Sequence, residues 1–506
     1  MKRIFKSLLC LMCALCLSAC STVSSGTTSV NAPTLAPAQN TRPVPNDFSG
    51  MVAEQTVTLY LPSRDGQRLL AQYTTLQLDR TGNPEEAVVR ALLSFPMNSE
   101  VMPLGMGVTV LGLYGQHPVE VSDGVCTVNL SSSLLQLEYS QQYTVCLALA
   151  ATLSALGSVN YVNVLVANQP LSLDITGSLP AGSTAPHPGE ELEVLWTQMD
   201  ARRPELGQDP ANQPLSAAAT LYFPLADGTG FVSETRTLSF SGQSGSMLAS
   251  GLLSALSTGA QYLSGTASMP DFSSLLAGEP VVEELADGGR RVHLYFVDNL
   301  TSRLELLGLD PVCTLGAVVY TLSTFLPAVS GIYLYSGGTP LTRLSNTFQT
   351  ENGLVRRSDF SDLLMVQRQI RLCRNGKLTT VYGTLPWDLA NDPASLLMLL
   401  ASSPTQAQQA EGITSPLPDG LDETDILGMA MDGDCLVVNL SPRFERLLRQ
   451  AGAEGEQLAC YSMVNTLCDA LSVRRVCFLF EGEMAETLGG TIYWGGEFLQ
   501  NDLLSE

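Results

Sequence analysis

Side chains that could carry out chemistry are few and scattered in this 506-residue chain. Its three histidines, His117, His187 and His293, lie in a turn-like stretch, a proline-rich linker and a strand-like segment. A metal centre or a Ser-His-acid site would need them close to carboxylates or to a serine on a tight elbow. No such spacing occurs, and neither a Gly-Lys-Ser/Thr phosphate loop nor a dinucleotide fingerprint is present. The sequence therefore predicts no catalytic residue, no cofactor and no metal ligand.

Two kinds of polar residue recur at matching places. Asp123, Asp287 and Asp432 each precede a glycine. Such an aspartate could be a general acid or a calcium ligand, but Asp-Gly also favours a tight turn, because both residues tolerate positive φ. We favour the turn. Asn129 and Asn439 could hold a ligand, but each ends a strand before a serine that can cap a helix.

The tryptophans and cysteines also admit two interpretations. Trp387 and Trp494 could stack on sugars, although isolated tryptophans more often belong to the core. Of the twelve cysteines, four lie in the first 20 residues, and most of the others sit within hydrophobic patterns. There a free cysteine packs as a small hydrophobe, so buried thiols are expected. A Cys126–Cys146 disulfide stays open, because export would permit it.

The N-terminal residues are typical of an export signal. Lys2 and Arg3 precede an apolar run from Leu8 to Leu17, which is shorter than the ~20 residues of a membrane span. The run ends in Leu17-Ser18-Ala19-Cys20, which resembles a bacterial lipobox, where the cysteine thiol takes a diacylglyceryl group. An ordinary signal peptide with an incidental cysteine is the alternative. We predict that residues 1–20 are a lipoprotein signal peptide and that Cys20 is lipidated.

The next segment and the overall charge limit the possible partners. Residues 21–52 are rich in Ser, Thr, Pro and Ala, which predicts a flexible tether. The net charge of −23 argues against nucleic acid as a partner and against a basic membrane-binding face. A solvated surface explains this charge as well as a cationic partner would.

A domain-sized unit occurs three times along the chain. Each copy has an Asp-Gly turn, a strand, a long helix and a closing strand. The pairs Thr152-Leu153, Thr321-Leu322 and Thr466-Leu467 fall at corresponding places in the helices. The copies are far longer than the ~20–50-residue periods of solenoids. A hairpin and a shorter helix precede each unit, so the predicted order is β-β-α-β-β-α-β, with residues 108–113 as the third strand of the first copy.

The predicted fold class is therefore α+β: three tandem small domains with mixed sheets and with helices packed on one face. Each copy is long enough to hold its own core and is expected to fold alone. The predicted boundaries are 53–175 for copy one, 176–216 for a Pro/Gly-rich linker, 217–345 for copy two, 346–367 for a stiffer linker, 368–485 for copy three and 486–506 for a C-terminal extension.

These motifs resemble the GerMN domain, named for a sporulation and germination lipoprotein of spore-forming bacteria. The likeness rests on the opening Leu-Tyr-(Leu/Phe)-Pro-x-x-Asp-Gly, on the Thr-Leu helix and on Asn129-Leu130-Ser131 and Asn439-Leu440-Ser441. Copy two departs from it with His293-Leu294-Tyr295. The resemblance implies small α+β domains related to ring-building modules of cell-envelope assemblies, and a non-catalytic role.

We therefore expect a non-enzymatic protein anchored in the cell membrane on its extracytoplasmic side. Its partners would be the membrane, through the lipid on Cys20, and envelope proteins of sporulation or germination, for which the three domains act as docking or assembly modules. Oligomerisation stays open. The alternative is a lipoprotein that binds cell-wall glycan or a small ligand. An exposed aromatic cleft would favour the alternative, and exposed sheet edges or flat apolar patches would favour docking.

Overall fold

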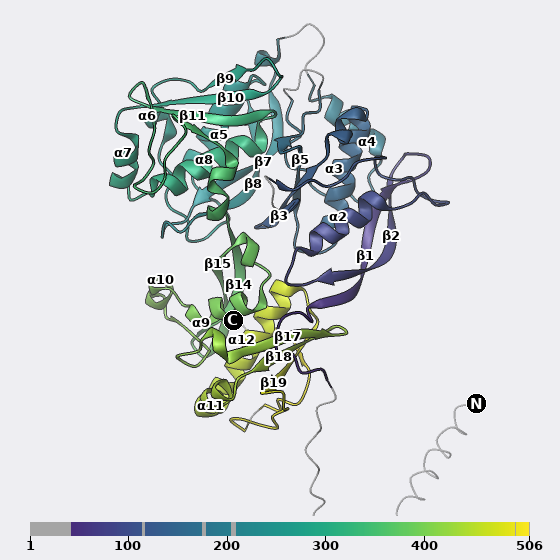
Figure 1. Ribbon diagram of the computed structural model, residues 1–506, viewed down its shortest axis with the longest axis vertical. Coiled ribbons are helices and arrows are strands. Elements are labelled where there is room, and N and C mark those ends of the chain that lie inside the picture. Colours follow the sequence, from purple (N-terminus) through teal and green to yellow (C-terminus); the bar gives the residue numbers. More distant parts are fainter. Residues whose placement is uncertain (1–41, 114–116, 175–178, 204–208, 491, 505–506) are drawn as a thin grey trace, which may run out of the picture. The chain divides into compact units, whose positions relative to one another are not determined.

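The structure is a computed structural model that describes residues 42–113, 117–174, 179–203, 209–490 and 492–504. Those residues fall within one compact unit, which runs from Thr41 onwards (Figure 1). Cys20, the signal peptide and the tether up to residue 41 lie outside the described residues. Lipidation therefore stays a prediction.

Copy one begins with a hairpin and continues into a mixed sheet crossed by one long helix (Figure 1). Asn83 precedes Pro84, the first residue of α2, where proline is tolerated because its missing N–H has no intrahelical partner. The elements are β1 (Val52–Pro62), β2 (Leu69–Asp79), α2 (Pro84–Ser94), β3 (Val119–Ser122), β4 (Val125–Leu130), η2 (Ser132–Gln136), α3 (Tyr139–Ser154), β5 (Tyr161–Val166) and β6 (Gln169–Pro170).

Copies two and three repeat this order with added short helices. Copy two has β7 (Leu215–Pro224), β8 (Phe231–Phe240), α5 (Gly245–Ser257), α6 (Phe272–Leu275), β9 (Val281–Glu284), β10 (Arg290–Phe296), α7 (Leu300–Leu306), α8 (Pro311–Phe325), β11 (Val329–Ser336) and β12 (Thr339–Pro340). Copy three has β14 (Met365–Arg374), β15 (Lys377–Pro386), α9 (Pro393–Ser402), α10 (Gln406–Ala410), β16 (Ile413–Thr414), β17 (Ile426–Asp432), β18 (Cys435–Leu440), α11 (Pro442–Gln450), α12 (Gly452–Leu471), β19 (Arg475–Phe480) and β20 (Phe498–Leu499).

The sheets confirm the predicted fold class, α+β with the order β-β-α-β-β-α-β. The main sheets are β3-β4-β5-β6, β12-β11-β10-β9 and β17-β18-β19-β20. In each, the two strands joined by the long helix are parallel and their outer neighbours are antiparallel, as a helical crossover requires. The long helices α3, α8 and α12 pack on the hairpins of their own copies.

A buried threonine explains why the Thr-Leu pair recurs. In each copy its hydroxyl oxygen accepts a hydrogen bond from a backbone N–H on the first strand of the hairpin. The three threonines are fully buried, so this bond satisfies a polar group that would otherwise be costly. The bonds join Tyr60 to Thr152 (2.9 Å), Tyr222 to Thr321 (3.0 Å) and Arg371 to Thr466 (3.1 Å).

The hydrophobic cores do not follow the three copies one by one. Copies one and two share a single cluster of buried residues, whereas copy three has its own. Both connecting segments contribute to the shared cluster. Helix α4 (Leu192–Asp200) adds Leu192 and Leu195, and the segment between β13 (Leu354–Val355) and β14 adds Phe360. The shared core is at odds with the expectation that copy two folds alone, because apolar burial there depends on copy one.

The N-terminal strap, residues 42–51, binds to copy three. The backbone N–H of Met429 donates to the carbonyl of Asp47 (2.9 Å), and that of Met431 donates to the carbonyl of Gly50 (2.8 Å). A side chain at Gly428 would not fit, because its Cβ would lie 2.5 Å from the backbone nitrogen of Asp47. The last residues of the predicted tether are therefore part of the folded unit.

Two further segments differ from the sequence prediction. The third strand of copy one is β3, whereas residues 108–113 make only an isolated bridge between Val110 and Leu130. Residues 486–504, expected as an extension, contribute β20 and the fully buried Trp494 to the core of copy three. Among the helices described, none is long and apolar enough on its own to cross a membrane; α7 and α8 reach that length only as a pair bent by 109°.

Candidate functional site

A cavity of about 1180 Å³ opens where elements of all three copies meet. Its walls come from the end of β2 and the start of α2, from β8 and the loop after α5, and from β14, β15 and the end of α12. Amide and hydroxyl side chains are frequent, including Gln55, Asn160, Gln261, Gln367, Gln369 and Asn391. Such groups donate and accept hydrogen bonds without net charge.

Asp123 bridges the copies from one side of this cavity. It sits in the predicted turn, with φ of 48° followed by 78° at Gly124. Its carboxylate also accepts hydrogen bonds from the backbone N–H of Gln367 (2.7 Å) and of Ser233 (3.4 Å), which belong to copies three and two. Burial raises the pKa of Asp123 to about 6, against the opposing effect of these bonds. The turn interpretation is confirmed, but it misses this role between copies.

Glu85 and Arg80 bring opposite charges to the cavity. One oxygen of Glu85 accepts from the hydroxyl of Ser158 (3.1 Å), and the other, Oε2, has no hydrogen-bond partner. Arg80 donates to the carbonyl of Leu471 (2.9 Å), and its Nε has no partner. Burial raises the pKa of Glu85 and lowers that of Arg80, because each charge is kept from water.

The other charged groups of the cavity are satisfied internally. Arg368 donates to the carbonyl of Ala390 (3.0 Å) and to Asn391 (3.0 Å), and burial lowers its pKa. Glu234 and Arg236 form a buried pair with a 2.6 Å contact. Among the described residues, neither a histidine nor a cysteine lines the cavity. The arrangement offers hydrogen-bond donors and acceptors that can bind a polar molecule.

The remaining candidates lie elsewhere. His117 is 3.6 Å from Glu86, His187 is 3.0 Å from Glu190, and His293 on β10 is 3.1 Å from Glu283. Each histidine therefore lies next to a glutamate of its own part of the chain. Asp287 accepts from the backbone N–H of Gly289 (2.9 Å), as a turn residue does, and Asp432 ends β17 and lies 3.7 Å from Arg42.

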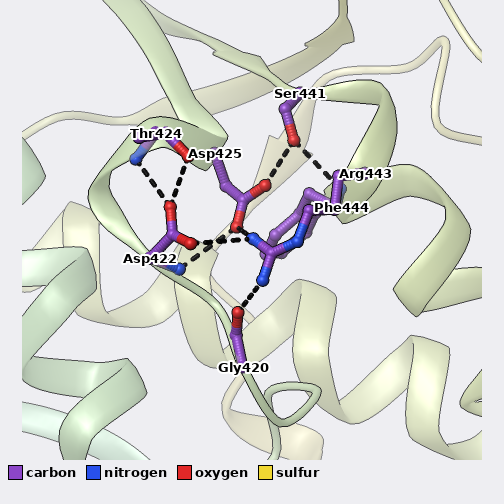
Figure 2. Close-up of polar contacts among 7 residues, drawn as sticks. All are labelled: Gly420, Asp422, Thr424, Asp425, Ser441, Arg443 and Phe444. Atoms are coloured by element: carbon purple, nitrogen blue, oxygen red, sulfur yellow. Dashed lines mark hydrogen bonds and ion pairs between the residues drawn. The ribbon is translucent and has the colours of Figure 1, made fainter.

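The serine of the Asn-Leu-Ser motif caps a helix in copy three, whereas Ser131 in copy one makes no side-chain capping bond. Figure 2 shows that Ser441 accepts from the backbone N–H of Phe444 (3.0 Å), which caps α11, and donates to Asp425 (2.5 Å). Arg443 joins Asp425, Asp422 and the carbonyl of Gly420. Capping with this ion-pair network accounts for the serine without any ligand.

The asparagine of the motif fastens a neighbouring segment. Asn439 donates to the carbonyl of Pro45 in the N-terminal strap (2.9 Å), and Asn129 donates to the carbonyls of Leu111 (3.2 Å) and Gly112 (3.1 Å). The same residue type thus holds the strap in copy three and a local loop in copy one.

Comparison with known proteins agrees with this repeat. The sequence model of the Germane family, described as sporulation and spore germination, matches residues 58–172 and 375–486. These two regions therefore resemble domains of the Germane family. The matched ranges fall in copies one and three, and copy two lies outside them.

Solved structures resemble the chain only distantly. The tandem GerMN domains of the sporulation protein GerM from Bacillus subtilis share 16% identity, over 61% of this chain and 98% of that one, with a TM-score of 0.23. A protein described as a lipoprotein from Clostridium perfringens shares 16% identity, over 28% of this chain and 93% of that one, with a TM-score of 0.18. No curated protein matches significantly. The assignment of the two Germane domains therefore rests on the family match and on the element order.

The cavity could not be predicted from the sequence, because its walls come together only when copies one and three pack against copy two.

The prediction that an isolated tryptophan belongs to the core is confirmed for Trp494. Trp494 is core, since it is fully buried among Phe478, Phe480 and Phe498. The eight cysteines from Cys126 onwards are buried and free, so Cys126 and Cys146 are not bridged.

Proposed function

We propose that this chain is a lipid-anchored, extracytoplasmic and non-catalytic protein whose domains dock envelope partners during sporulation or germination. The family description supports the process. The observation that carries the docking role is the outer edge of β2, which pairs with no strand other than β1 in the described part of the chain. Such an edge can accept an added strand from a partner. We also infer that copy two is a divergent Germane domain, because it keeps the element order and the bond from Tyr222 to Thr321.

The anchor is tested at Cys20. Replacing Cys20 with alanine is expected to move the protein from the membrane fraction to the soluble fraction or to leave its signal peptide uncleaved, because no thiol is left for the acyl groups. Membrane fractionation with metabolic labelling by a tagged fatty acid measures this. Cys16→Ala, a change elsewhere in the signal peptide, is the control and should stay anchored. A Cys20→Ala protein that is matured and retained like the wild type contradicts the anchor.

The docking edge is tested at Tyr73 on β2, whose side chain is 75% exposed. Tyr73→Glu should reduce recovery of envelope partners in a cross-linked pull-down about tenfold, equivalent to ~1.4 kcal/mol, because it removes apolar contact and adds charge at the edge. Circular dichroism should stay unchanged. Tyr493→Glu, at another exposed tyrosine, is the control. Equal losses for both variants would remove the case for this edge.

A second candidate function, the binding of cell-wall glycan, is favoured by the cavity. Tyr262 and Tyr382 line the cavity beside the amide groups described above. These two residues are 76% and 46% exposed. Tyrosine rings offer apolar faces to the CH groups of sugars, while amides bond pairs of hydroxyls.

Glycan binding is measured by titrating the purified protein with N-acetylglucosamine oligomers in a calorimeter. Tyr262→Ala is expected to weaken binding about tenfold, equivalent to ~1.4 kcal/mol, through the loss of ring contact. Tyr73→Ala, outside the cavity, should bind like the wild type. An absence of heat at millimolar oligomer would rule out this second function and leave the docking proposal standing.

A further inference from the structure

Two cysteines of copy three meet across adjacent strands. Cys435 is the first residue of β18, and Cys477 lies in β19, to which β18 pairs in parallel. Their sulfur atoms are 3.0 Å apart, and both side chains are buried. Among the cysteines that the structure describes, these two lie in contact with each other. A modest approach of the two sulfurs would bring them to bonding distance.

The surroundings favour the reactive form of one sulfur. Arg42, in the N-terminal strap, forms an ion pair with Glu497, which also pairs with Arg475. The hydrogen bond from Cys477 and the positive charge of Arg42 lower the pKa of Cys435, whereas the same hydrogen bond and burial raise that of Cys477. One sulfur can therefore attack as a thiolate while its neighbour keeps its proton.

A metal ion fits this cluster less well. The two sulfurs and a carboxylate oxygen of Glu497 lie within 4.8 Å of one another, and thiolates are preferred ligands of zinc. However, Glu497 is already paired with Arg42 and Arg475. A dication at the sulfurs would displace or face these two guanidinium groups, at an electrostatic cost.

We propose that Cys435 and Cys477 are a redox pair that forms a disulfide between β18 and β19 by exchange with an extracytoplasmic disulfide donor. The Cys435 thiolate attacks one sulfur of the donor, a mixed disulfide forms, and one donor thiolate leaves. Cys477 then loses its proton and attacks the Cys435 sulfur, which releases the second donor thiolate. The two protein thiols are oxidised by two electrons in total, and the donor disulfide is reduced to two thiols.

The inference rests on the extracytoplasmic location in the proposed function, because such donors persist in oxidising compartments. The chemistry itself can be tested apart from location. The mature chain, treated with oxidised glutathione at neutral pH, should lose the mass of two hydrogen atoms, and a peptide map should link Cys435 to Cys477. The oxidised protein should also show a higher urea midpoint for copy three, since the bond closes a loop in the unfolded chain.

Three variants separate this pair from its neighbours. Cys435→Ser should abolish the linkage, whereas Cys460→Ser, at another buried cysteine of copy three, should leave it intact. Arg42→Gln should slow oxidation several-fold at pH 7 and less at pH 9, where the thiol ionises without help. That pH dependence would not follow from a merely structural role of Arg42.

The outcomes that overturn the inference are distinct from those that overturn the proposed function. Both thiols remaining alkylatable after oxidation, a disulfide between other cysteines, or stoichiometric zinc bound to the reduced pair would each reject the redox pair. If the pair oxidises in the purified protein, but protein trapped with alkylating agent in cells is reduced and cytoplasmic, the proposed location fails and the redox pair stands.

Discussion

Replacing Arg357 with alanine is expected to lower the free energy of unfolding by about 3–5 kcal/mol, because it strands a buried carboxylate. Arg357, in η4 (Arg357–Leu363), donates to Glu120 of copy one (2.9 Å) and to Thr324 of copy two (2.5 Å), and its guanidinium lies 3.8 Å from the ring centre of Tyr320. All of these bonds are lost at once. Urea denaturation followed by circular dichroism measures the change.

The neighbouring residue supplies a matched control. Arg356 also pairs with a glutamate, Glu351 (3.1 Å), but both side chains are exposed. Arg356→Ala should therefore cost less than ~1 kcal/mol, as exposed ion pairs do. A double variant, Arg357→Met with Glu120→Leu, should recover most of the loss, because no unpaired charge remains. Equal effects of Arg356→Ala and Arg357→Ala would contradict the assigned role.

The loss at Arg357 should depend on pH in a defined direction. Burial already raises the pKa of Glu120, and removing Arg357 takes away the charge that opposes this shift. A carboxyl whose pKa is higher in the folded than in the unfolded state stabilises the fold below its unfolded value, and this contribution is lost as the pH rises. Arg357→Ala should therefore be closer to the wild type near pH 4 than at pH 7.

Replacing Trp494 with alanine should destabilise copy three by about 3–5 kcal/mol through the cavity it leaves. Its ring centre lies 5.2 Å from that of Phe478 and 5.5 Å from that of Phe480, and its Nε1–H donates to the buried Glu456 (2.8 Å). Because copy three has a separate core, urea unfolding should have two transitions. Trp494→Ala should move one and Arg357→Ala the other.

Tyr493 provides the comparison for Trp494. It is adjacent in sequence but exposed, so Tyr493→Ala should change stability by less than ~0.5 kcal/mol. Trp494→Phe should fall between the two, since it keeps ring packing and leaves Glu456 without its indole donor. If Trp494→Ala unfolded like the wild type, residues 486–504 would be an extension after all.

Local patterns carry much of this fold. The Asp123-Gly124 turn, the alternation around it and the helical spacing after it depend on neighbours in sequence, so they predict the element order correctly. The recurrence of the Thr-Leu pair could also be detected in the sequence. The threonine hydroxyl must reach one particular backbone N–H, so the threonine keeps the same position on the helix in each copy. The misplaced strand at 108–113 shows the limit, because a β-branched run pairs only where a partner strand is available.

The sequence did not predict the contacts between distant segments. Nothing near Arg357 indicates that it meets Glu120, 237 residues away, because the approach depends on how two copies pack. The same holds for Asp123, whose turn is evident while its bond to Gln367 is not. The candidate cavity is likewise lined by residues that are far apart in the sequence. Predicting that Cys435 and Cys477 meet would require the register of β18 against β19. The sequence does not determine that register, because the 20-residue helix α12 separates the two strands.

The N-terminal strap decides where force would enter the molecule. If Cys20 carries the proposed lipid, any pull from the membrane reaches the strap before β1, and the strap is bonded to β17 and to Asn439 of copy three. The load would pass first into the domain farthest along the chain, so the first copy would be shielded for as long as the strap holds. Detaching the strap would take Arg42 away from the sulfur of Cys435 and lengthen the tether by ten residues, ~33–36 Å at full extension.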